Sequence, residues 1–229
     1  GKSTFLRTIY GDLDPTTGTI ALGPGERLSV LKQDHFAYDG FTVLDTVLMG
    51  HQPLWETMKE KEALYAKPDF SEEDGLRAGE LEERFAEMQG WNAESDAANL
   101  LSSLGVREAL HGQLMRDLSA KEKVRVLLAQ ALFGKPDNLL LDEPTSSLDI
   151  RNQYQVLQIV QELCHHDGLT AIVVIHDLNL ALRFCDRFLL LRQGQVYANG
   201  NYTVLSPKAL QDVYQIDGHV VEVENQKMV

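Results

Sequence analysis

The chain has 229 residues, a net charge of −13 and 44% hydrophobic residues, a composition that suits a globular protein with its own core. No run of eighteen apolar residues occurs, and the start lacks the basic and apolar regions of a signal peptide, so neither a membrane span nor a leader is expected. The acidic balance argues against a nonspecific nucleic-acid surface, and we expect no direct DNA binding. Two distant cysteines, Cys164 and Cys185, favour a reducing, cytoplasmic setting.

Hydrophobic periodicity divides the chain into three stretches. The first 40 residues are expected to form a helix at 4–10 and strands at 19–22 and 28–31. Residues 41–133 are amphipathic and acidic, with helices expected at 42–49, 54–65, 71–89, 93–104 and 121–133. Strands and helices then alternate, with strands at 139–141, 171–175, 188–191 and 195–198, and helices at 152–164, 178–185 and 207–214.

The apolar strands at 139–141 and 171–175 are what a sheet covered on both faces requires. The pattern therefore predicts an α/β fold in which both ends of the chain contribute to one lobe. We expect a single domain over residues 1–229, with a catalytic lobe at 1–40 and 134–229 and a helical lobe inserted at 41–133.

The chain opens with the residues that end a phosphate-binding loop, Gly1-Lys2-Ser3-Thr4. Such a turn supplies backbone N–H groups and an ammonium to phosphates, and a hydroxyl to a metal ion. Four residues of this kind also arise by chance, so the motif alone does not decide the function.

A second motif lies near the middle, where the apolar strand at 139–141 ends in Asp142 and Glu143. One carboxylate in this position can enter a magnesium shell, while the next lies beside the γ-phosphate of a nucleotide. By itself the segment could equally be a core strand that enters a polar loop. Together, the two motifs predict a nucleoside-triphosphate hydrolase that uses Mg²⁺.

Four further landmarks accompany these motifs in a fixed order. Gln33 follows the strand at 28–31, Ser119 opens a helix, Asp149 ends Ser-Ser-Leu-Asp, and His176 follows the strand at 171–175. Their order and spacing resemble the Q-loop, signature, D-loop and switch histidine of the ATP-binding cassette (ABC) ATPases. The resemblance covers essentially the whole chain, and it implies a P-loop NTPase fold of the ABC type, N-terminally truncated within its phosphate loop.

The resemblance also implies roles for these residues. Glu143 would be the general base, His176 would contact the γ-phosphate, and Gln33 would reach both the metal and the attacking water. The remaining roles are ATP binding by Gly1, Lys2, Ser3, Thr4, Ser119 and Asp149, and magnesium binding by Ser3, Gln33 and Asp142. A second ABC domain, in cis or in trans, would stack head to tail on the first, with Ser119 and Asp149 at the interface.

The signature departs from the family pattern because Ala120 and Lys121 replace the two glycines that normally follow the serine. Glycine lets backbone approach a phosphate closely, so this departure puts fast hydrolysis in doubt more than ATP binding. An ATP-dependent dimerisation module with little hydrolysis therefore stays open as an alternative.

The two parts of the chain resemble different branches of the family. Residues 1–141 resemble the F subfamily of ribosome-associated factors, with the likeness carried by 41–51 and 123–134. Residues 145–229 resemble ATPase subunits of importers for iron-siderophore, haem or cobalamin, with the likeness carried by 176–183 and 206–217. A natural mosaic, a fusion and a fragment all fit. We rank the ribosome-associated factor first, and a permease-bound importer subunit, peripheral to the inner membrane, second.

Overall fold

We describe the protein from a computed structural model, which covers residues 1–32, 34, 36–146, 148–224 and 226–229. The chain forms two compact units. The α/β unit consists of Gly1–Gln33 and Asp137–Val229, and the helical unit consists of Asp34–Pro136. Among the described residues, no helix combines the length and the apolar character that crossing a membrane requires.

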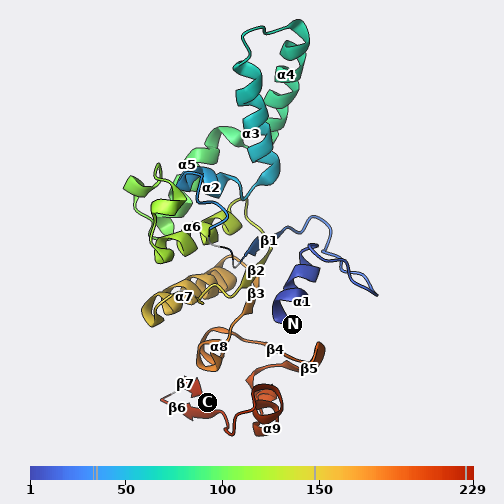
Figure 1. Ribbon diagram of the computed structural model, residues 1–229, viewed down its shortest axis with the longest axis vertical. Helices are drawn as coiled ribbons and strands as arrows, with labels where there is room; N and C mark the ends of the chain where they lie inside the picture. The colour runs from blue at the N-terminus through green and yellow to red at the C-terminus, as the bar shows by residue number, and fades with distance from the viewer. Residues whose placement is uncertain (33, 35, 147, 225) are drawn as a thin grey trace. The chain divides into compact units, whose positions relative to one another are not determined.

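The α/β unit is built on a parallel sheet in the order β1-β2-β3, formed by Leu28–Leu31, Asn138–Asp142 and Thr170–Val174. The central strand β2 is apolar along most of its length, and Leu140 lies opposite Val30 on one side and Ile172 on the other. Helices α1 (Lys2–Ile9) and α7 (Ile150–His166) flank the sheet (Figure 1). The expected α/β fold is confirmed, and β2 is buried as a doubly covered strand should be.

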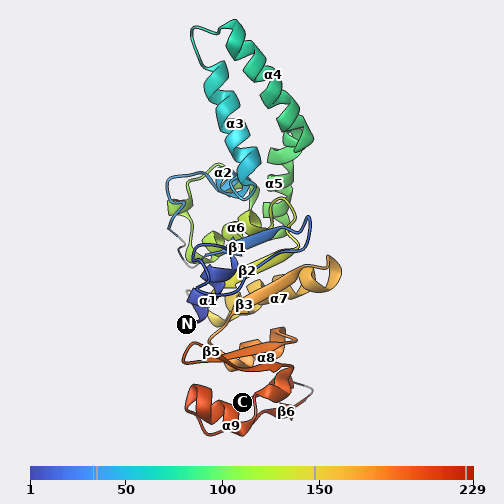
Figure 2. The ribbon, with the colours of Figure 1, turned by 90° about the vertical axis from the view of Figure 1, so that its right-hand side faces the viewer.

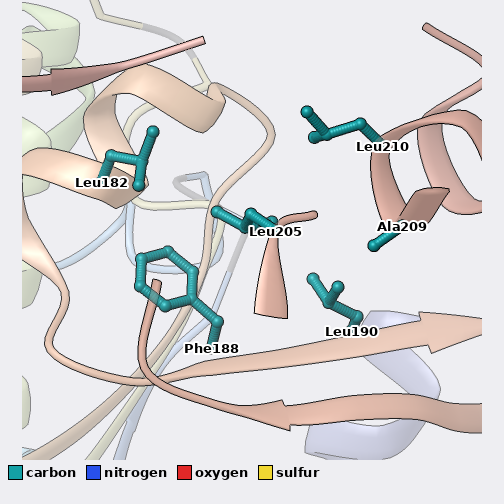
Figure 3. Close-up of a cluster of buried hydrophobic side chains, with 6 residues drawn as sticks. All are labelled: Leu182, Phe188, Leu190, Leu205, Ala209 and Leu210. Atoms are coloured by element: carbon teal, nitrogen blue, oxygen red, sulfur yellow. The ribbon is translucent and has the colours of Figure 1, made fainter. Parts of the chain in front are cut away.

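A second group of elements completes the α/β unit. These elements are α8 (Leu178–Phe184), the antiparallel strands β4 (Phe188–Arg192) and β5 (Gln195–Gly200), α9 (Pro207–Ala209) with a π-helical turn at Leu210–Tyr214, and the hairpin β6 (Val221–Val223) and β7 (Gln226–Met228). Their buried side chains form a separate apolar core around Leu205 (Figure 3), which also contains Leu182, Phe188, Leu190, Ala209 and Leu210.

The strand expected at 19–22 does not form. Ile20 and Leu22 remain almost half exposed, so the alternating apolar residues have no sheet face on which to be buried. A short alternating run gains little from the extended conformation unless a neighbouring strand supplies hydrogen bonds and a buried face.

In the described part of the helical unit, the α-helices are α2 (Val43–Leu48), α3 (Gln52–Tyr65), α4 (Glu72–Glu87), α5 (Ala93–Ser103) and α6 (Ala120–Leu132). Short 3₁₀ turns occupy Gly90–Asn92, Glu108–Leu110 and Met115–Asp117. Helix α2 packs against α5 and α6, and α3 pairs with α4 as a helical hairpin (Figure 2). The side chains of Leu101, Met115 and Leu128 are completely buried within this unit.

Helix α4 begins at a capping box formed by Ser71 and Asp74. The Ser71 hydroxyl accepts a hydrogen bond from the Asp74 amide at 3.1 Å, and the Asp74 carboxylate accepts from the Ser71 amide at 3.0 Å. Lys67 also donates to this carboxylate. The reciprocal bonds satisfy amides that the first turn of a helix would otherwise leave unpaired.

These contacts predict a pH dependence of stability. Hydrogen bonds from Lys67 and then Ser71 lower the pKa of Asp74 to about 2, from its usual 3.8. Because the unfolded chain binds this proton more readily, the carboxylate stabilises the fold above about pH 4, and that contribution is lost as pH falls towards 2. Denaturant unfolding of wild type and Asp74→Asn should therefore differ most at pH 5–6 and converge at low pH. A stability difference that stays constant over this range would contradict the assignment.

Candidate nucleotide site

The predicted phosphate-binding residues lie at the start of α1. Gly1 is the N-cap, its carbonyl accepts a hydrogen bond from the Phe5 amide at 3.1 Å, and Lys2 opens the helix. The side chains of Lys2 and Ser3 are half-buried, whereas Gly1 and Thr4 are exposed. A helix start presents unpaired amides and a partial positive charge, so this arrangement suits an anionic phosphate.

Ser3 and Asp142 lie together although 139 residues separate them in sequence. The Ser3 hydroxyl donates to the Asp142 carboxylate with an oxygen–oxygen distance of 3.2 Å. Asp142 ends β2 and is only 9% exposed. Burial raises the pKa of this carboxyl and the adjacent Glu143 raises it further, while the bond from Ser3 and the charge of His176 lower it.

This pair fits a magnesium ion. Mg²⁺ prefers hard oxygen ligands, usually one or two from the protein, and takes the rest of its shell from water and phosphate. A hydroxyl and a carboxylate within hydrogen-bond distance are such a donor set. The positive charge of the ion would also favour the ionised form of Asp142, against the effect of burial.

Glu143 and His176 form the second close pair. The His176 Nε2 atom lies 2.7 Å from the Glu143 Oε1 atom, a hydrogen bond that an N–H at Nε2 donates to the ionised carboxylate. The histidine side chain is 65% exposed and that of the glutamate only 20%. The next residue, Asp177, caps α8, because its carboxylate accepts from the amides of Asn179 and Leu180.

The backbone at Glu143 is unusual. Its φ angle is +52°, a left-handed conformation that side chains with a Cβ rarely adopt. The amide and the hydroxyl of Ser146 both donate to the Glu143 carbonyl, at 3.2 and 3.1 Å, and hold the turn. Sequence reasoning missed this serine, although the Pro-Thr-Ser composition after Glu143 is a turn signal.

Asp149 and Ser119 both lie at helix starts. The Asp149 carboxylate caps α7 by accepting from the amide and side chain of Asn152, at 2.9 and 2.8 Å. The Ser119 hydroxyl donates to the Glu122 carboxylate at 2.7 Å, within a capping box at the start of α6. Ala120 and Lys121 form the first turn of that helix, so they replace glycines without preventing helix formation.

The α/β unit therefore brings four of the predicted residues together at the carboxyl ends of β2 and β3, namely Ser3, Asp142, Glu143 and His176. Ser119 belongs to the helical unit. Gln33, predicted to reach the metal and the attacking water, lies outside the described residues.

Comparison with known proteins now places the chain in a family. The profile of the family described as ABC transporter matches residues 1–146. This chain belongs to the ABC transporter family. The predicted P-loop NTPase fold of the ABC type is thereby confirmed, and the chain is an ABC ATPase domain.

Individual relatives point the same way. The chain is 53% identical over 204 residues to the uncharacterized ABC transporter ATP-binding protein YkpA of Bacillus subtilis, an alignment that covers 88% of the chain and 37% of YkpA. It is 32% identical to the hemin import ATP-binding protein HmuV of Bordetella avium, over 96% of the chain and 80% of HmuV. The chain thus spans little more than a third of the length of YkpA.

A solved structure of dimeric MJ0796 in a post-hydrolysis state with ADP and Pi superimposes on this ABC ATPase with a TM-score of 0.62. The two are 24% identical, and the match covers 88% of this chain and 80% of the other. At this level of identity the likeness concerns the fold alone.

Proposed function

We propose that this ABC ATPase is the ATP-hydrolysing subunit of a membrane importer for a metal chelate or haem. The two units would together form one ATPase domain over residues 1–229. The observation that carries the enzymatic part of the proposal is the placement of Ser3 against Asp142 and of Glu143 against His176 at one edge of the sheet. The importer part rests on the likeness to HmuV, which extends over 96% of the chain.

In the proposed reaction, Lys2 and the first amides of α1 bind the phosphates of ATP, with Gly1 and Thr4 in the same turn. Ser3 and Asp142 would hold Mg²⁺, which would neutralise charge on the phosphates when it is bound. Glu143 accepts a proton from the attacking water as general base. The support for His176 as its partner is the 2.7 Å contact with Glu143, and in this proposal the imidazole would orient the carboxylate and contact the γ-phosphate.

We also propose that two such domains act as a head-to-tail pair. Ser119 of one domain would approach the nucleotide held by the other, and Asp149 would lie at the interface. Ser119 currently donates to the negatively charged Glu122, whose pKa is lowered chiefly by that hydrogen bond. When the two domains close, a phosphate of the nucleotide therefore has to compete with Glu122 for the Ser119 hydroxyl. Lys121 adds a positive charge beside Ser119.

The ribosome-associated interpretation, which the sequence placed first, moves to second place. YkpA and HmuV are named as an ABC transporter protein and a hemin import protein, which supports a permease partner. One observation keeps the ribosome as a second candidate. That observation is the resemblance of residues 41–51 and 123–134 to the F subfamily of ribosome-associated factors.

We expect the full-length protein to bind a membrane permease. The test uses a tagged Glu143→Gln variant with ATP, because this variant should remain in the nucleotide-bound state. In one arm, the variant is pulled down from detergent-solubilised membranes of its own host. In the other arm, its co-sedimentation with ribosomes through sucrose is measured. We expect a polytopic membrane protein to be recovered in an amount comparable to that of the tagged variant. This protein should be lost when ADP replaces ATP. Co-sedimentation with ribosomes without any permease would reverse the ranking.

A further inference from the structure

Gln153 lies in the first turn of α7 and contacts the turn that precedes this helix. Its side-chain Nε2 atom donates to two main-chain carbonyls, that of Thr145 at 3.1 Å and that of Leu148 at 3.0 Å. Both partners are carbonyl oxygens, which only accept hydrogen bonds, so the amide nitrogen has to face them. One side chain therefore joins the beginning and the end of this turn.

The environment makes these bonds difficult to replace. Thr145 and Leu148 are both buried, and Gln153 itself is partly buried. Without the Gln153 amide, the carbonyls of these two buried residues would each lose a hydrogen bond, so deletion of the amide should loosen the turn. The Thr145 carbonyl also accepts from the Leu148 amide at 3.2 Å, and the loss of Gln153 would weaken the group of bonds as a whole.

The turn connects two residues of the nucleotide site. Glu143, with its left-handed backbone, lies just before Thr145, and Asp149, the N-cap of α7, follows Leu148 directly. Ser146 fixes the Glu143 carbonyl from within the same segment. Gln153 therefore joins α7 to the main chain that follows Glu143.

We propose that Gln153 is a positioning residue for ATP hydrolysis, which acts by clamping the Thr145 and Leu148 carbonyls. The inference rests on the proposed function, because it concerns the same reaction. It predicts a specific kinetic signature. A loosened turn should misplace Glu143 during hydrolysis while leaving the phosphate contacts of α1 unchanged, so kcat should fall and KM for ATP should not.

The test compares Gln153→Leu, which has a similar volume and no donor, with Gln153→Lys, whose ammonium can donate to both carbonyls. In the full-length protein, Gln153→Leu should lower kcat roughly tenfold with KM for ATP changed less than about twofold. Gln153→Lys should retain most of the activity. Gln158→Leu is the matched control on the same helix, since Gln158 is exposed and its amide donates to the exposed Glu162.

Wild-type kcat in Gln153→Leu, or an equal loss in Gln153→Lys, would overturn the proposal. If Gln153→Leu does not fold, Gln153→Asn provides the same comparison, because it keeps the amide but is one methylene too short to reach both carbonyls. Glu143→Gln is measured alongside. Full turnover in that variant would defeat both the proposed function and this inference, whereas its loss beside an unaffected Gln153→Leu would defeat the inference alone.

Discussion

Replacing Leu140 by alanine should lower the free energy of unfolding by about 2–5 kcal/mol. Leu140 is 1% exposed in the centre of β2, and it belongs to the apolar cluster formed with Leu6 and Val174. Its removal would leave a cavity that neighbours from α1 and β3 can fill only in part, because close-packed interiors relax little. Urea unfolding followed by far-ultraviolet circular dichroism measures the loss.

Leu189→Ala supplies the matched control for this prediction. Leu189 is also a strand leucine, but it lies in β4 and is 41% exposed, so the same truncation removes much less buried surface. We expect a loss within about 1 kcal/mol. Equal losses in the two variants would show that β2 is not the core strand of the α/β unit.

Much of this core was predictable because its signals are local. Leu-Leu-Leu before Asp142 is a continuous apolar strand, and Asp149 precedes a periodic helical pattern, so β2 and α7 follow from propensity and capping. The run at 19–22 has a similar local signal and fails, because a strand is stabilised by neighbours that the run itself does not specify.

The site was predictable in its residue types and less so in its contacts. The pairing of Glu143 with His176 depends on the register of β2 and β3, where Asp142 lies opposite Val174. That register arises only when β2 and β3 pair in the sheet, so it cannot be predicted from the sequence of either strand alone. The positive φ of Glu143 and the bonds made by Gln153 have no sequence signature, because glutamate and glutamine are common in many other settings.

The largest effect on activity is expected for Glu143→Gln. The substitution keeps the shape of the side chain and removes the base, so ATP turnover should fall by about 10²–10⁴-fold. ATP binding should persist because Ser3 and Asp142 make their contact independently of this carboxylate. The hydrogen bond from His176 can still be accepted by the amide oxygen of glutamine, so the turn should stay in place.

Glu222→Gln is a suitable control for the removal of a negative charge. Glu222 lies exposed in β6, in a different part of the α/β unit, and has no place in the proposed reaction. Its replacement should leave turnover unchanged. A similar loss in both variants would indicate that the effect at Glu143 comes from altered net charge or folding.

Single-turnover phosphate release by the full-length protein, measured beside ATP affinity for wild type and Glu143→Gln, tests the assignment of the hydrolytic site most directly. We predict that the dissociation constant for ATP changes by less than about threefold while phosphate release slows by about 10²–10⁴-fold. Phosphate release at the wild-type rate in Glu143→Gln would contradict the account, because the base would then lie elsewhere than at the end of β2.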